Sequence, residues 1–224
     1  MIRGGSLNVL IDLDGTLTDS APGIISCIRH ALTEAGRECP DDAALRHFIG
    51  PPLHETLRKI LGTDDPAQLA AVIELYRRQF SERGLYENAV YPGIPAALQA
   101  LKDAGVALFV ATSKPLVYAQ RIIRHFGLDG YFGAVYGSEF DGTLSNKSEL
   151  IAHILKAESL SPAATSMVGD RSHDVVGANA NGVRPVGVLW GYGSRAELTA
   201  AGASVLCEQP ATLARDVVEG TGAR

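Results

Sequence analysis

Two aspartates follow a short apolar run near the start of the chain. The run over residues 7–11 predicts a buried strand that ends at Asp12, and Asp14 follows two residues later in a turn that contains Gly15. Side chains two residues apart can point the same way. One carboxylate could then attack phosphorus, while the other protonates the leaving oxygen and later deprotonates water. Gly15 would let the backbone come close to a bound phosphate.

Other predicted strands and helices carry side chains suited to binding a cation or a phosphate. In chain order they are Thr112, Ser113 and Lys114 after the strand 106–111, Lys147 before the helix 148–158, and Asp170 and Asp174 after the strand 165–168. Four carboxylates in one crevice would repel one another unless a cation lay among them. Mg²⁺ suits such a site because it takes a few carboxylates, water and a phosphate oxygen. Lys147 and Thr112 would then hold the remaining phosphate oxygens.

The elements that must position these residues predict an α/β fold with a helical insert. Residues 1–18 and 90–224 alternate strands with helices, which predicts a doubly wound, mostly parallel sheet. Residues 19–89 form the insert, a helical cap with apolar stripes over 20–36, 53–61 and 66–82, the first of them capped by Ser20. Ligands of open α/β sheets lie beyond the carboxyl ends of the strands. We therefore expect the polar residues above to meet in one crevice, which the cap covers and uncovers by hinges near 18–20 and 88–93.

The composition of the chain indicates which partners and which cell compartment to expect. The chain has 224 residues, 46% of them hydrophobic, and a net charge of -5. Lys and Arg are scattered, so we expect no nucleic-acid polymer as partner. The three cysteines lie far apart, which favours reduced thiols over disulfides or zinc. The N-terminus lacks a signal-peptide pattern and no apolar run reaches membrane-spanning length, so we expect a cytoplasmic monomer or homodimer without a membrane partner.

Four segments together resemble the motifs of the haloacid-dehalogenase-like hydrolases. They are DLDGTLTDS, VATSKP, LSNKSELI and MVGDRSHDVVGANANG, in the order of that family. The resemblance implies that Asp12 is the nucleophile, Asp14 the general acid/base, and Thr112 and Lys147 the phosphoryl-binding pair. It also implies a Mg²⁺ ion held by the Asp12 carboxylate, the Asp14 backbone carbonyl and Asp170, with Asp174 assisting. The chain departs from the usual motifs in two places. Position 113 is serine, where phosphoglycolate-phosphatase-like members often have asparagine, and Lys147 is followed by serine, where proline is common.

The resemblance implies a magnesium-dependent hydrolase of small phosphate esters. The segments around 170 and 190 look closer to the 5′-nucleotidase-like branch, so we expect nucleoside 5′-monophosphates as substrates, with phosphoglycolate as the alternative. In the cap, His54 and Arg58 are candidates for substrate contact. Asp14 argues against a dehalogenase, and Lys59 is a poor Schiff-base candidate for a phosphonate hydrolase.

Other functions are compatible with these motifs. A phosphomutase is compatible with the motifs, and a non-catalytic phosphate- or metal-responsive switch is the alternative from a different class. Lys114 and Arg171 lie at the crevice without an assigned role. The turn Gly191–Ser194 is only a weak nucleotide-binding signal, because it lacks a third glycine.

Overall fold

The first apolar run forms the centre of a parallel sheet. The computed structural model describes residues 7–219, and in it β1 (Asn8–Ile11) is buried along its whole length. Asn8 lies opposite Ala107 of β4 on one side and opposite Thr165 of β6 on the other. Val9 and Ile11 join the core on one face of the sheet, while Leu10 joins the core on the other face. Consecutive apolar residues, here Val9, Leu10 and Ile11, are typical of a strand with both faces covered.

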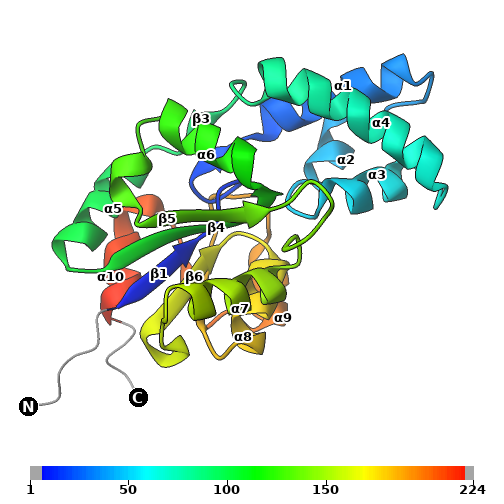
Figure 1. Cartoon of the computed structure of the whole chain (residues 1–224). Helices are drawn as coiled ribbons and strands as arrows, with labels where there is room; N and C mark the ends of the chain where they lie inside the picture. The colour runs from blue at the N-terminus through cyan, green and yellow to red at the C-terminus, as the bar shows by residue number, and fades with distance from the viewer. Residues whose placement is uncertain (1–6, 220–224) are drawn as a thin grey trace, which may run out of the picture.

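The six strands are parallel and lie in the order β5-β4-β1-β6-β7-β8. The other strands are β4 (Ala107–Pro115), β5 (Ala134–Ser138), β6 (Thr165–Gly169), β7 (Arg184–Val188) and β8 (Val205–Cys207). One face carries α7 (Lys147–Ala157), α8 (Ser172–Ala180) and α9 (Arg195–Ala201), and the other carries α5 (Ile94–Asp103), α6 (Leu116–His125) and α10 (Leu213–Val218) (Figure 1). Short 3-10 turns lie at η2 (Asp129–Tyr131), η3 (Pro162–Ala164) and η4 (Pro210–Thr212). The predicted doubly wound sheet is confirmed.

A layer of helices lies above the carboxyl end of the sheet (Figure 1). It contains α1 (Ala21–Glu34), α2 (Asp42–Arg46), α3 (Leu53–Leu61), α4 (Pro66–Gln79) and the π-helical turn η1 (Phe80–Gly84). α1 packs against α4 and η1, and a side chain at Gly23 would come within 2.0 Å of the Gly84 carbonyl oxygen. Glycines at this crossing let the two backbones approach closely. The three predicted cap helices are present, and the short α2 was not predicted.

Two short strands connect the cap to the core. β2 (Thr18–Asp19) and β3 (Ala89–Val90) pair antiparallel, so the chain enters and leaves the cap through one two-stranded ribbon. Ser20 is the N-cap residue of α1 as predicted, but its side chain makes no capping hydrogen bond. The Tyr192 hydroxyl instead accepts hydrogen bonds from the Ser20 and Ala21 backbone N–H groups at 2.9 and 3.0 Å. A tertiary contact therefore satisfies the first turn of α1.

The observed elements differ from the predicted ones in three further places. β4 runs on through Thr112 to Pro115, with a register irregularity against β5 in that stretch. Lys147 is the first residue of α7, where Asn146 caps the helix by accepting from the Ser148 N–H at 2.8 Å. α5 was not predicted, although its buried Ile94, Ala97, Leu98 and Leu101 have helical spacing. Among residues 7–219, no helix has the length and apolar character needed to span a membrane.

Candidate active site

Lys147 and Asp12 form a buried ion pair at the end of β1. The Lys147 ammonium donates to Asp12 Oδ1 and to the Ala111 carbonyl oxygen, each at 2.7 Å, and lies 2.7 Å from Asp174 Oδ1. The side chains of Lys147 and Asp12 are only 2% and 5% exposed. Burial acts to lower the Lys147 pKa, but Asp12 and Asp174 outweigh it and hold this pKa above its ordinary value. The ammonium is therefore charged and fixed beside Asp12.

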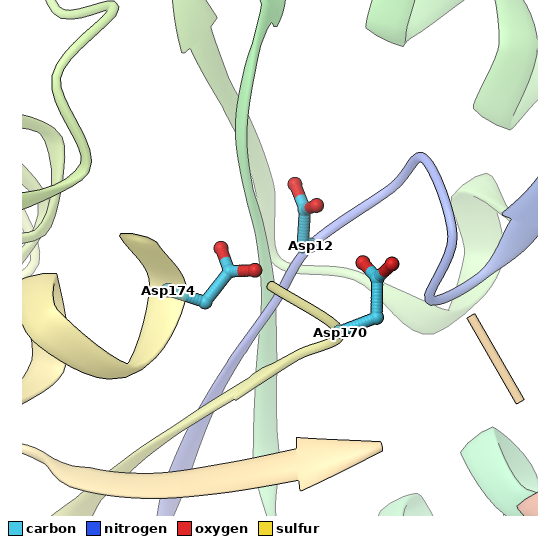
Figure 2. Close-up of side chains that lie close together, drawn as sticks. All are labelled: Asp12, Asp170 and Asp174. Atoms are coloured by element: carbon cyan, nitrogen blue, oxygen red, sulfur yellow. The ribbon is translucent and has the colours of Figure 1, made fainter. Parts of the chain in front are cut away.

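Three carboxylates from different elements converge on this point. Oxygens of Asp12, after β1, Asp170, after β6, and Asp174, in α8, all lie within 4.8 Å of one another. Figure 2 shows these carboxylates gathered around a common space at the end of the sheet. Burial and the negative charges of Asp174 and Asp12 raise the pKa of Asp170 well above its usual range. A buried set of oxygen donors whose charges repel one another fits a hard divalent cation such as Mg²⁺.

Asp170 is enclosed by backbone from two loops. Its Oδ2 accepts from the Tyr192 backbone N–H at 2.7 Å, and its Oδ1 accepts from the Thr16 hydroxyl at 3.2 Å. A side chain at Gly15 would lie 2.3 Å from Oδ2, and one at Gly191 would lie 2.5 Å from it. The absence of a side chain at Gly15 therefore makes room for Asp170. The Gly15 N–H donates to the Thr18 carbonyl oxygen at 2.8 Å, so it is not free to donate to a phosphate, the contact predicted from the sequence.

The two glycines of the Gly191–Ser194 turn also make room for Asp170. A side chain at Gly193 would lie 1.9 Å from the Asp170 carbonyl oxygen. Both glycines of this turn therefore allow close packing against the Asp170 backbone and side chain, which explains the glycine pattern without a nucleotide.

Asp14 lies at the edge of the cluster, towards the cap. Its Oδ2 is 2.7 Å from the Lys114 ammonium, which lies over the ring of Phe80 at 4.7 Å from the ring centre. Oδ1 of Asp14 is buried and has no hydrogen-bond partner within residues 7–219. A buried carboxylate oxygen without a hydrogen-bond partner is costly, so Asp14 Oδ1 is a candidate to meet a substrate.

The two hydroxyl residues of β4 have different surroundings. Thr112 is buried at the strand end, and its Oγ1 accepts from the Lys114 N–H at 3.2 Å. The Ser113 hydroxyl donates to the Ser145 carbonyl oxygen at 2.9 Å, while the Ser113 carbonyl accepts from Ser138 at 2.9 Å. Ser113 therefore fixes the loop after β5, and its hydroxyl is engaged there.

A cavity of about 460 Å³ lies between Asp14 and the cap. Its walls are largely apolar and aromatic, and include Ile24, Phe48, Tyr76, Phe80, Tyr118 and Phe140. His54, a candidate for substrate contact, lines this cavity together with Lys114. Arg58 does not line it, because its guanidinium pairs with Asp64 at 3.2 Å. The cavity is large enough for an organic group attached to a phosphate bound at Asp12.

Two arginines join the cap to the core beside this cavity. Arg77 of α4 donates to the Phe140 carbonyl oxygen at 2.7 Å and lies 4.7 Å from the centre of the Phe140 ring. Arg171 of the core donates to the Ile49 carbonyl oxygen of the cap and is oriented by Glu197 at 3.0 Å. Sequence reasoning missed Arg77 and Phe140, because their 63-residue separation gives no local signal of contact.

Comparison with known proteins identifies the family. The sequence profile described as haloacid dehalogenase-like hydrolase matches residues 9–188. The chain is a haloacid dehalogenase-like hydrolase. This hydrolase is 48% identical over 212 residues to a 5′-nucleotidase of Pseudomonas aeruginosa, and the match covers 95% of each chain. The crystal structure of a predicted phosphatase from Clostridium acetobutylicum has 39% identity and a TM-score of 0.91, over 96% of this chain and all of that one.

Another relative is longer than the hydrolase. The tyrosine-protein kinase PtkA of Mycobacterium tuberculosis is 47% identical over 185 residues, which are 83% of this chain. The match spans 62% of the length of PtkA. Taken together, the family, the nucleotidase and phosphatase relatives and the sheet with its helical cap show that the hydrolase is a phosphoric monoester hydrolase.

Proposed function

We propose that the hydrolase is a magnesium-dependent 5′-nucleotidase that transfers the phosphoryl group of nucleoside 5′-monophosphates to Asp12 and then to water. One observation carries the proposal. Asp12 is fixed by Lys147 inside a buried acidic cluster, while Asp14 opens onto an apolar cavity of about 460 Å³. The first residue suits attack on phosphorus, and the second lies on the side where a leaving group would be.

In the first step, a carboxylate oxygen of Asp12 attacks the phosphorus and the ester P–O bond breaks. Asp14 in its protonated form gives its proton to the leaving oxygen, so the nucleoside departs as a neutral alcohol. The Lys147 ammonium is engaged by Asp12, Ala111 and Asp174, so we expect its charge to stabilise the phosphoryl oxygens in the transition state, while the Thr112 hydroxyl donates to one of them.

In the second step, Asp14 has become a carboxylate and takes a proton from water. The water oxygen attacks the phosphorus, the P–O bond to Asp12 breaks, and inorganic phosphate leaves. Asp12 is again a carboxylate and Asp14 is again protonated, so the cycle closes.

The acidic cluster would hold the cation. Asp12 and Asp170 would be direct ligands, with the Asp14 backbone carbonyl, and Asp174 would assist. A bound Mg²⁺ supplies positive charge that offsets the carboxylates and the phosphate. The protein itself holds these carboxylate oxygens in place: Lys147 donates to Asp12, and the Thr16 hydroxyl and the Tyr192 N–H donate to Asp170.

The walls of the cavity support a nucleoside over glycolate as leaving group. A nucleobase presents planar apolar faces, which suit walls such as Phe48, Tyr76 and Phe140. Phosphoglycolate has only two carbons and a second anionic group, which would need a free cation. Lys114 is paired with Asp14, and Arg77 shares the cavity wall with the acidic residues Glu74, Glu139 and Asp141, which disfavour a second anionic group. The nucleotidase relative points to the same substrate class.

Steady-state kinetics on a panel of phosphomonoesters test the proposal. The panel compares nucleoside 5′-monophosphates with 2-phosphoglycolate in the presence of Mg²⁺, and Asp12→Asn measures contaminating phosphatase. We expect kcat/KM to be highest for the nucleotides. A higher kcat/KM for 2-phosphoglycolate would replace the nucleotide assignment with the alternative, phosphoglycolate phosphatase.

A further inference from the structure

Lys114 is a buried lysine that the two steps above do not use. Its side chain is 6% exposed and comes from β4, two residues beyond Thr112. A buried ammonium is costly unless it is paired. Asp14 Oδ2 at 2.7 Å and the face of the Phe80 ring at 4.7 Å provide the compensation.

The backbone beneath Lys114 is tightly held. A side chain at Gly137 of β5 would lie 2.6 Å from the Lys114 carbonyl oxygen, so the two strands are in close contact there. The Lys114 N–H also donates to Thr112 Oγ1 at 3.2 Å. The ammonium therefore extends from a fixed point of the core towards the Phe80 ring, which belongs to the cap.

The two oxygens of Asp14 differ in their surroundings. Oδ2 is bound by Lys114, whereas Oδ1 is buried without a hydrogen-bond partner in the part of the chain that the structure describes. The Asp14 side chain lines the cavity that would hold the leaving group. A carboxyl group held by one oxygen can present the other in a constant direction.

We propose that Lys114 is a positioning residue for Asp14, holding Oδ2 so that Oδ1 faces the leaving oxygen and then the attacking water. This inference rests on the acid/base role of Asp14 in the proposed function. Because Phe80 covers the ammonium from the cap, the arrangement is complete only when the cap lies over the site. Lys114 thereby links cap closure to the alignment of the acid.

Two substrates whose leaving groups differ in their need for protonation distinguish a positioning role of Lys114 from a purely structural role. We compare Lys114→Met with Lys114→Arg and with the exposed control Lys156→Met. Activity is measured on p-nitrophenyl phosphate, whose leaving group needs little protonation, and on a nucleoside 5′-monophosphate, whose leaving group needs it. We expect Lys114→Met to lose about tenfold more kcat/KM on the nucleotide than on the aryl ester, a part of the roughly 100-fold or more that general acid catalysis contributes. Lys114→Arg should recover part of the loss.

A double-mutant cycle with Asp14→Asn decides whether Lys114 acts through Asp14. We expect Lys114→Met to cause no further loss in the Asp14→Asn background. Equal losses in both backgrounds, or equal losses on both esters, would overturn the proposal. Wild-type turnover of Asp14→Asn would instead refute the acid/base role of Asp14, which is a separate result.

Thermal unfolding shows whether each variant is folded. If Lys114→Met does not fold, Phe80→Leu carries the test, because it removes the ring and keeps an apolar side chain. Phe80→Leu should also lose more kcat/KM on the nucleotide than on the aryl ester, by a smaller factor than Lys114→Met. In the Asp14→Asn background, Phe80→Leu should cause no such difference between the two esters. An equal effect of Phe80→Leu on both esters would overturn the proposal.

Discussion

Lys147 donates a 2.7 Å hydrogen bond to Asp12 Oδ1 where both side chains are almost fully buried. Removing one partner of such a pair leaves an uncompensated charge, which costs about 3–5 kcal/mol. We expect Lys147→Met to lower the free energy of unfolding by about that amount and to abolish turnover. Urea unfolding in EDTA measures the loss, with the exposed Lys156→Met as control.

The double variant Lys147→Met/Asp12→Asn completes this experiment. It should be more stable than Lys147→Met, because Asp12, one of the two carboxylates that lose the ammonium, is then replaced by a neutral side chain. A Lys147→Met protein as stable as the wild type would contradict the buried pair.

Replacing the nucleophile should stop the reaction without unfolding the protein. Asp12→Asn keeps the size of the side chain but removes the carboxylate that attacks phosphorus, so turnover should fall below detection. Substrate labelled in its phosphate should leave hydroxylamine-sensitive label on the wild-type protein in a rapid quench, and none on Asp12→Asn. Undiminished turnover by this variant would exclude an aspartyl-phosphate at Asp12.

Mg²⁺ should stabilise the folded protein as well as support its activity. EDTA should stop catalysis and added Mg²⁺ should restore it. Since a ligand of the folded state raises stability with its concentration, Mg²⁺ should also raise the Tm. Asp170→Asn should lose this rise, whereas the exposed control Asp129→Asn should keep it. An equal rise in both variants would place the cation elsewhere.

The core of the site could be predicted because its signals are local. Asp12 follows an apolar run too short for a helix, and Asp170 follows a second one, so both fall at strand ends of one sheet edge. The tertiary contacts could not be predicted in this way. Arg77 donates to the Phe140 carbonyl oxygen 63 residues along the chain, and the α1 N-terminus is capped by Tyr192, which is 171 residues from Ala21. Such choices depend on which surfaces meet after folding.

The metal-free protein should become less stable as pH rises through the pKa of Asp12. Burial, opposed by Lys147, raises this pKa from 3.8 to about 6. Between those values the folded state binds more protons than the unfolded state, so stability contributed by Asp12 is present at low pH and is lost as pH rises towards about 6. In EDTA, the Tm of the wild type should therefore fall relative to the Tm of Asp12→Asn as the pH is raised from 4.5 to 7. A pH-independent difference would contradict the raised pKa.

Arg171 should hold the cap over the site. Its guanidinium donates to the Ile49 carbonyl oxygen, and a hydrogen bond to a charged group contributes about 1.5–3 kcal/mol. Arg171→Gln should therefore open the cap, lower kcat/KM for nucleotides and speed hydrogen exchange in the loop 48–53. The matched control is Arg195→Gln, because Arg195 pairs with Glu208 on the exposed surface. Exchange as slow as in the wild type would show that the Arg171 contact does not keep the cap closed.

The loop around Tyr192 touches two parts of the molecule at once. Its backbone N–H is bound to Asp170, its hydroxyl caps the helix that begins the cap, and its two glycine neighbours pack against Asp170 with no space for a side chain. None of these three residues takes part in bond making. Random mutagenesis should nevertheless find Gly191 and Gly193 as intolerant as the nucleophile, so tolerance to substitution is a poor guide to chemistry in this segment.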